Sequence, residues 1–230
     1  MLHITWLGHS GFAAETCGHL LVFDAYQHLD LIPIAPNKPT LYFASHNHGD
    51  HFNRDIFTHP ADLFVLGADV RAKHTDMPLV HLDEGEKLER LGAHVETFGS
   101  TDAGVSFRVT TDGYYLFHAG DLNCWYWEEE STPQELQDDY TAWRTQLERL
   151  NDGTPIHVAF FPVDPRLGPH LAKGGVEYAA AVHPEWFIPM HFSAGDADVA
   201  AALEEIAAQG TRPLFPLQPG WSWTYIEKGA

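Results

Sequence analysis

Short runs of apolar residues, or of alternating apolar and polar residues, recur along the chain and predict many β-strands. Strands are expected at residues 2–7, 11–16, 19–24, 40–44, 62–66, 79–82, 93–98, 104–111, 114–118, 156–161 and 186–190, with closing strands within 213–226. Turns are expected between several of these runs, among them Cys17-Gly18 and Asp112-Gly113. The density of strands indicates a chain whose core is built from β-sheet.

Helical spacing of apolar residues appears between the strands. Four apolar residues stand three or four positions apart in the acidic segment 128–150: Leu136, Tyr140, Trp143 and Leu147. This spacing predicts an amphipathic helix, which Pro133 can restart from its first turn. Further helices are expected at 52–57, 68–75, 172–183 and 196–209. Strands with intervening helices occur twice in succession, which favours two sheets packed face to face with helices outside, in one domain spanning 1–230.

Length and composition narrow the class of protein. A chain of 230 residues is long enough for one sizeable core. The sequence has no run of 18 apolar residues and no basic segment followed by an apolar one at its start, so neither a membrane span nor a secretory signal is expected. Cys17 and Cys124 are the only cysteines, which favours a reducing, cytoplasmic location.

The charge balance bears on the choice of partner. The net charge is −19, from 32 acidic and 13 basic residues. Nucleic acid is therefore disfavoured, because its binding needs clustered Lys and Arg. The acidic balance mainly indicates a well-solvated surface.

Three histidines and one aspartate fall within six residues directly after the apolar run 40–44. Neutral imidazole and carboxylate are the usual protein ligands of zinc and similar ions. In an extended segment His46 and His48 point to the same side, and a turn at Gly49 can swing Asp50 and His51 toward a neighbouring point. Two ligand sets side by side are what a two-metal hydrolase requires. A histidine-rich surface loop is the alternative, which the position after an apolar strand disfavours.

The motif Ser45-His46-x-His48-x-Asp50-His51 resembles the signature of the metallo-β-lactamase superfamily. Four further stretches are similar to the branch of that superfamily that contains lactonase-like and phosphodiesterase-like hydrolases: Trp6-Leu7-Gly8-His9-Ser10-Gly11-Phe12, Val22-Phe23-Asp24, Ala119-Gly120-Asp121 and Pro189-Met190-His191-Phe192. The resemblance implies an α/β (α+β) fold, a four-layer αββα sandwich of two mixed β-sheets flanked by helices.

By this resemblance, six residues would hold one or two divalent metal ions: His46, His48, Asp50, His51, Asp121 and His191. Asp121 would bridge the two ions, and His191 would complete the second set with Asp50 and His51. Asp50 would also act in catalysis, by accepting a proton from the attacking water. Asp24 would support the histidine motif from behind, because carboxylates in that place orient ligand histidines; an aspartate that starts a turn is the alternative.

Two further histidines lie near these motifs. His9 follows Gly8 in a tight turn, where it either faces the site or caps the turn. His118 lies three residues before Asp121, and strand alternation should point it to the other side, so a structural role is expected.

The chain departs from the family pattern at one ligand. The family has another histidine between the histidine motif and the Gly-Asp pair, on the first metal ion. No histidine lies between His94 and His118, and His94 falls inside a predicted strand. Ser100 or Asp102 could substitute, or that ion is bound weakly, or the site works with one ion. Zinc is the expected metal, and a carboxylate in place of an imidazole would favour a harder ion such as manganese.

Two segments near the expected site could bind a substrate. Trp125 belongs to an aromatic run that either walls a pocket or anchors the following helix. Arg166 either holds an anionic group through its forked donors or pairs with Asp164 and fixes the turn between them.

The sequence therefore predicts a cytoplasmic metal-dependent hydrolase that uses metal-activated water on an ester, lactone or phosphodiester of a small-molecule substrate. The alternative is a non-catalytic or sensor-like metal-binding relative that has lost one ligating histidine. A di-iron oxidoreductase of the same fold ranks below both, because that type normally uses additional carboxylate ligands. Whether the chain forms a homo-oligomer is left open.

Overall fold

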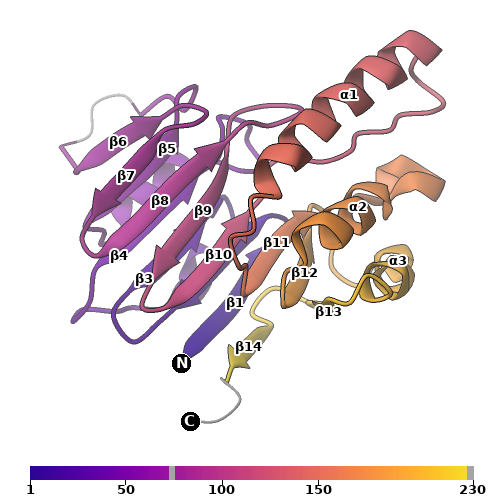
Figure 1. Ribbon diagram of the computed structural model, residues 1–230. Helices are drawn as coiled ribbons and strands as arrows, with labels where there is room; N and C mark the ends of the chain where they lie inside the picture. The colour runs from indigo at the N-terminus through magenta and orange to yellow at the C-terminus, as the bar shows by residue number, and fades with distance from the viewer. Residues whose placement is uncertain (73–75, 227–230) are drawn as a thin grey trace.

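Two mixed sheets of seven strands each lie face to face in the computed structural model, which describes residues 1–72 and 76–226 (Figure 1). The first sheet has the strand order β14-β1-β2-β3-β4-β5-β6. Its strands are β1 (Leu2–Gly8), β2 (Gly11–Glu15), β3 (Leu20–Phe23), β4 (Thr40–Ala44), β5 (Leu63–Gly67), β6 (Leu79–Leu82) and β14 (Ser222–Tyr225).

The second sheet has the order β13-β12-β11-β10-β9-β8-β7. Its strands are β7 (Lys87–Arg90), β8 (Ala93–Phe98), β9 (Ser106–Thr111), β10 (Tyr114–His118), β11 (Val158–Pro162), β12 (Trp186–Met190) and β13 (Arg212–Pro213). In each sheet one side is antiparallel, from β14 through β1 and β2 to β3 and from β7 to β10. The other side is parallel, from β3 to β6 and from β10 to β13. The two halves of the chain thus repeat one strand plan.

Three α-helices lie along the second sheet, on the side away from the first (Figure 1): α1 (Pro133–Leu150), α2 (Lys173–Val182) and α3 (Ala197–Ala207). A capping box between Thr132 and Glu135, with Pro133 at the first helical position, starts α1 at the residue that the sequence indicated. The outer face of the first sheet is covered by two short 3₁₀ helices, η1 (Leu29–Leu31) and η2 (Arg54–Thr58), and by the proline-rich loop that precedes β4. Within the described ranges, no helix combines the length and the apolar character needed to cross a bilayer.

Strand alternation distributes the apolar side chains between the layers. Phe160 stacks on Phe12 between the two sheets, with ring centroids 4.3 Å apart. Its neighbour Phe161 points the other way and stacks on Tyr178 of α2 at 4.6 Å. Because successive residues of a strand face opposite sides, a continuous apolar run such as β11 fills two layers at once.

Most predicted strands and the three longer helices are confirmed within a few residues. The helix expected at 52–57 is wrong, because the segment forms the short 3₁₀ helix η2. The helix expected at 68–75 is wrong for residues 68–72, which form a turn and irregular chain, and residues 73–75 lie outside the described part. The strand β7 was missed, because its sequence Lys-Leu-Glu-Arg carries one apolar residue and no alternation.

Segment 45–51, which follows β4 of the first sheet, is here called the histidine loop. Two turns of the second sheet, at Gly104 and Gly120, are in close contact with it. The backbone N–H of Val105 donates to the carbonyl oxygen of Ser45 at 3.1 Å. A Cβ on Gly104 would lie 2.1 Å from that oxygen and 2.4 Å from Cβ of His46, and one on Gly120 would lie 2.8 Å from Cβ of Ser45. Glycine is therefore required there by close backbone approach, and this contact brings the two sheets together at the loop.

Replacing Gly104 by alanine tests that contact. Gly104 and Gly113 both have positive φ, at 67° and 82°, but a Cβ on Gly113 would meet nothing within 4 Å. Gly113→Ala should lower the free energy of unfolding by about 1–2 kcal/mol through its backbone conformation alone. Gly104→Ala should cost at least about 2 kcal/mol more, because of its contact with Ser45. Chemical denaturation of both variants measures the difference, and equal losses would show that the turn does not press on the histidine loop.

Candidate metal centre

The polar residues singled out by the sequence follow the carboxyl ends of strands in both sheets. His9 follows β1, Asp24 follows β3, the histidine loop follows β4, Asp121 follows β10, Asp164 follows β11 and His191 follows β12. In each sheet these strands run in the same direction, so their carboxyl ends meet at one edge. This edge is where α/β sheets generally bind ligands.

Asp24 organises the histidine loop from behind. Its Oδ1 accepts from the backbone N–H of Ser45, and its Oδ2 accepts from Ser45 Oγ and from His51 Nδ1, all at 2.7 Å. The hydroxyl of Ser45 has one proton, which it donates to Asp24. Ser45 Oγ is therefore the acceptor in its hydrogen bond with Nδ1 of His46, at 2.9 Å. Both histidines therefore keep Nδ1 occupied and turn Nε2, with its lone pair, toward the centre.

Four residues form a first donor set: His9, Asp50, His51 and His191. Each offers one ligand atom, and these atoms all lie within 4.8 Å of one another. The His9 ring lies 4.3 Å from that of His191 between centroids, and His9 Nε2 lies 3.5 Å from Asp50 Oδ2. His9 was expected either to face the site or to cap a turn. It lies in a turn, with φ 49°, and its ring faces the other donors of this set. The sequence signal was the Gly-His step directly after the first strand.

Three residues form a second donor set: His46, His48 and Asp121. Their ligand atoms also lie within 4.8 Å of one another. His46 is fully buried and His48 is exposed, so this set opens toward solvent on the His48 side.

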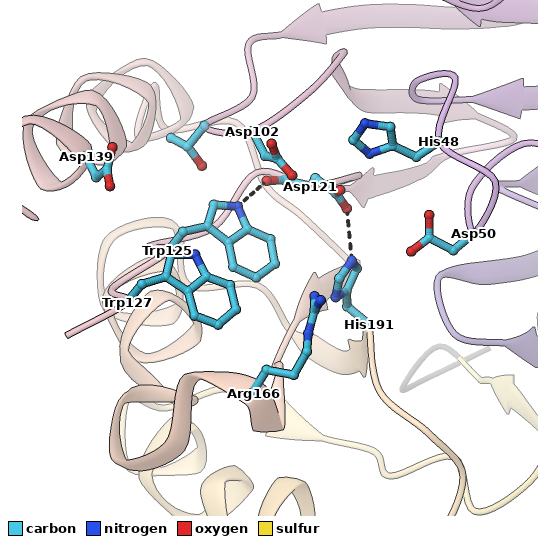
Figure 2. A pocket seen from close by; sticks show the side chains of 10 residues that line it. His48, Asp50, Asp102, Asp121, Trp125, Trp127, Asp139, Arg166 and His191 are labelled. Carbon is cyan, nitrogen blue, oxygen red and sulfur yellow. Dashed lines mark hydrogen bonds and ion pairs between the residues drawn. The ribbon is translucent and has the colours of Figure 1, made fainter. Parts of the chain in front are cut away.

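Asp121 lies between the two sets. Its Oδ2 lies 3.3 Å from His46 Nε2, and its Oδ1 lies 2.9 Å from His51 Nε2 and 3.3 Å from His191 Nε2. One carboxylate oxygen therefore faces each set, which is the arrangement of a carboxylate shared by two cations. Figure 2 shows Asp121 between the two tryptophans on one side and His48 and Asp50 on the other, with His191 directly below it.

The donor atoms fit a divalent cation. Four of them are buried and, among the described residues, make no hydrogen bond of good geometry: Nε2 of His9, His46 and His51, and Oδ1 of Asp121. This holds although His51 Nε2 and Asp121 Oδ1 lie only 2.9 Å apart. Burial alone would lower the pKa of His51, but the carboxylates of Asp121 and Asp24 outweigh it and raise the pKa to about 10. The same two carboxylates that favour a proton on this ring would favour a metal cation in its place.

A cavity of about 280 Å³ opens over the two sets. Figure 2 shows the indoles of Trp125 and Trp127 on the wall opposite His48 and Asp50. The two rings are parallel, 5.9 Å apart, and Trp125 Nε1 donates to the carbonyl oxygen of Asp121 at 2.8 Å. Trp125 thus both lines the cavity and holds the backbone of Asp121. Trp127 is a cavity residue that the sequence did not single out from the aromatic run.

Arg166 also lines this cavity, and it is paired with Asp164. This pairing was one of the two alternatives for Arg166, the other being contact with an anionic group of the substrate. Its Nε and Nη2 donate to Asp164 Oδ2 at 2.9 and 2.5 Å, and its guanidinium carbon lies 5.6 Å from the centre of the Trp127 ring. Asp164 in turn accepts from His191 Nδ1 at 2.9 Å. No role at the metal was predicted for Asp164, because its contact with His191 joins residues 27 positions apart in the chain.

The two candidates for the missing histidine differ in their position relative to the cavity. Asp102 lines the cavity together with His48 and Asp121 (Figure 2). Ser100 is not among the lining residues, and its Oγ accepts from the backbone N–H of Asp102 at 3.2 Å. Of the two candidates, therefore, only Asp102 shares the cavity with His48 and Asp121.

His118 is buried away from both donor sets. Its Nε2 lies 2.8 Å from the carbonyl oxygen of Ser10, and its ring stacks on Phe23 at 5.2 Å. Its Nδ1 accepts from the backbone N–H of Gly120 at 3.2 Å, so it shapes the turn that carries Asp121.

The family model described as the beta-lactamase superfamily domain matches residues 3–137. The chain belongs to this superfamily. A protein of Nitratidesulfovibrio vulgaris named a UPF0173 metal-dependent hydrolase is 29% identical over 140 residues, with 51% of this chain and 58% of that protein covered. A protein of the same name from Methanosarcina mazei is 20% identical over 248 residues, with 96% and 97% covered. The chain thus spans less than two thirds of the first of these relatives.

Solved structures share the whole arrangement of the two sheets. Igni18, a metallo hydrolase from Ignicoccus hospitalis, superposes with a TM-score of 0.68 at 17% identity and covers 99% of both chains. A putative metal-dependent hydrolase from Parabacteroides distasonis gives 0.66 at 16% identity, over 94% of this chain and 93% of that one. At these identities the likeness shows the fold, and it confirms the predicted sandwich of two mixed sheets flanked by helices.

Removing the Asp24 carboxylate should loosen the centre and lower stability together. Asp24→Ala leaves three buried donors without an acceptor, so the free energy of unfolding should fall by roughly 3 kcal/mol or more. Metal affinity, measured by competition with a chromogenic chelator, should fall roughly 10- to 100-fold, because two histidines lose their orientation.

Asp112→Ala is the matched control for this variant. Asp112 also has positive φ, 50°, and accepts from Thr16, Gly18 and His19 at the other end of β10. It should cost stability and leave metal affinity unchanged. Equal loss of affinity in both variants would show that Asp24 acts through general stability alone.

Proposed function

We propose that this protein is a metal-dependent hydrolase that cleaves an ester, lactone or phosphodiester bond of a small molecule. The observation that carries the proposal is Asp121, whose two carboxylate oxygens face two separate sets of buried histidine and aspartate donors. Membership of the superfamily and the names of the relatives in Nitratidesulfovibrio vulgaris and Methanosarcina mazei support it. The proposed ligands are His9, His46, His48, Asp50, His51, Asp121 and His191, with zinc as the expected metal and manganese as the alternative.

Divalent ions held by these residues would lower the pKa of water to near neutrality and polarise the scissile group. The protein side chains then have three tasks. Asp24 and the carboxylate of Asp121 hold the histidine rings in fixed orientations. Asp50, whose side chain is 51% exposed and lines the cavity, accepts the proton of the attacking water. The His9 ring beside Asp50 keeps the pKa of the Asp50 carboxyl well below its ordinary value, so this carboxylate is ionised at neutral pH.

The cavity suits a small substrate. Its volume of about 280 Å³ lies near the lower end of ligand pockets. The parallel indoles of Trp125 and Trp127 offer an apolar wall, and the guanidinium of Arg166 adds positive charge at the rim. We infer a substrate with a planar or apolar part against the indoles and its scissile bond over Asp121.

We also propose that Asp102 takes the place of the histidine that the family has on the first ion. The turn that carries it is anchored on both sides, by Thr101 Oγ1, which donates to the carbonyl oxygen of Asn123 at 2.5 Å, and by the contact of Gly104 with Ser45. Asp102 lies between these anchors and faces the cavity. A carboxylate in that position would complete the second donor set, directly or through water, and would favour a harder ion.

Metal removal tests the function. Chelator-treated protein should lose at least about 100-fold of its activity on a panel of lactones, esters and phosphodiesters, and reloading with zinc or manganese should restore it. His46→Ala should reproduce the loss with metal present. Equal turnover by stripped and loaded protein would contradict the mechanism, and a protein that binds metal but turns over none of the panel would favour a non-catalytic role.

The role of Asp102 is tested by metal counting. Asp102→Asn should weaken the more weakly held ion roughly 10-fold or more, while Asp139→Asn, which removes another carboxylate from the same cavity, should not. Asp102→His should shift the preference from manganese toward zinc. Elemental analysis after dialysis against buffered metal measures both effects, and an unchanged metal count in Asp102→Asn would exclude it as a ligand.

A further inference from the structure

The first donor set contains two histidines that are backed by carboxylates. His51 donates through Nδ1 to Asp24, and His191 donates through Nδ1 to Asp164. Both acids are buried, with their side chains 0% and 2% exposed. The ring of His191 is thus held between Asp164 on its Nδ1 side and Asp121 on its Nε2 side.

The two backing carboxylates differ in their own partners. The remaining hydrogen bonds to Asp24 come from the backbone N–H and the hydroxyl of Ser45, which is buried. The remaining hydrogen bonds to Asp164 come from Arg166, whose side chain is 64% exposed and lines the cavity. Oδ1 of Asp164 accepts from the backbone N–H of Arg166 at 2.9 Å, so the acid also caps the 3₁₀ helix η3 (Pro165–His170). Burial raises the pKa of Asp164, but the bonds from His191 and Arg166 outweigh it and bring the pKa to about 2.

The bonds of Arg166 constrain what it can do. Nε and Nη2 are both committed to Asp164, so this side of the guanidinium is not available to a substrate. Its charge offsets that of a carboxylate that would otherwise be buried against His191 alone. Figure 2 shows the guanidinium beside the His191 ring, on the Trp127 side of the cavity.

We propose that Asp164 and Arg166 are a positioning pair for His191. Arg166 holds Asp164 by a bidentate contact, and Asp164 holds the imidazole with Nε2 toward the first donor set. Arg166 thereby connects the rim of the cavity to a metal-facing histidine through two consecutive contacts. The inference rests on the proposed metal centre, and it assigns Arg166 a role that exists before any substrate binds.

The proposal is tested by metal affinity in the absence of substrate, with cobalt and zinc as probes. Asp164→Asn keeps one acceptor oxygen, which can serve either His191 Nδ1 or the N-cap of η3, and it removes the charge that Arg166 binds. Arg166→Gln removes the guanidinium and leaves the acid. Each variant should weaken the better-held ion about 10-fold, within the range for residues that orient metal ligands. The visible absorption of the cobalt-loaded protein should change in both, and Arg166→Lys should restore part of the affinity.

Arg212→Gln is the matched control. Arg212 is also exposed, bonds Glu185 at 3.2 Å and lies 5.2 Å from the centre of the Trp186 ring. It pairs with Trp186 at the start of β12, the end of the strand opposite to His191. It should leave metal affinity and the cobalt spectrum unchanged. Unaltered affinity in Arg166→Gln and Asp164→Asn, with the apo proteins folded by circular dichroism, would overturn the inference while leaving the metal centre standing. Failure of the unmodified protein to bind either metal would instead remove the proposed function itself.

Discussion

The burial of the Asp24 carboxylate behind the histidine loop is the interaction on which the site depends. Burying a carboxylate lowers the free energy of unfolding by roughly several kcal/mol unless hydrogen-bond donors surround it. Here Ser45 and His51 supply three such donors. In satisfying Asp24, they fix the start of the loop and the direction of two imidazoles. Asp24, His9 and His191 also have positive φ, a conformation that costs about 1–3 kcal/mol each and persists only where surrounding contacts impose it.

The second constraint is that the residues of the centre are divided between the two sheets. The first sheet contributes His9, Asp24 and the histidine loop, and the second contributes Asp121 and His191. Neither sheet holds a complete donor set alone, because each set includes one residue of the second sheet, and Asp121 contacts His46 and His51 across the interface. The tight backbone approach of Gly104 and Gly120 to Ser45 keeps that interface closed where the donors meet.

The two donor sets differ in a way that bears on their proposed chemistry. The first has four members, and two of its histidines are backed by buried acids. The second has three members and opens to solvent at His48. On the proposed function, the first set would hold its ion more firmly, and the ion at the second set would exchange more easily and depend on Asp102. In both sets histidines and carboxylates converge.

The sequence by itself determined the strands, the longer helices and the composition of the histidine loop, because apolar periodicity and the spacing of His46, His48 and His51 are local properties. Resemblance to a family added Asp121 and His191. Only the tertiary structure decided that His9 faces these residues, that Asp102 rather than Ser100 lines the cavity, and that Arg166 is bonded to Asp164 behind His191. Such relations depend on how strand ends from two sheets meet, and contacts between residues distant in the chain leave no periodic trace in one sequence.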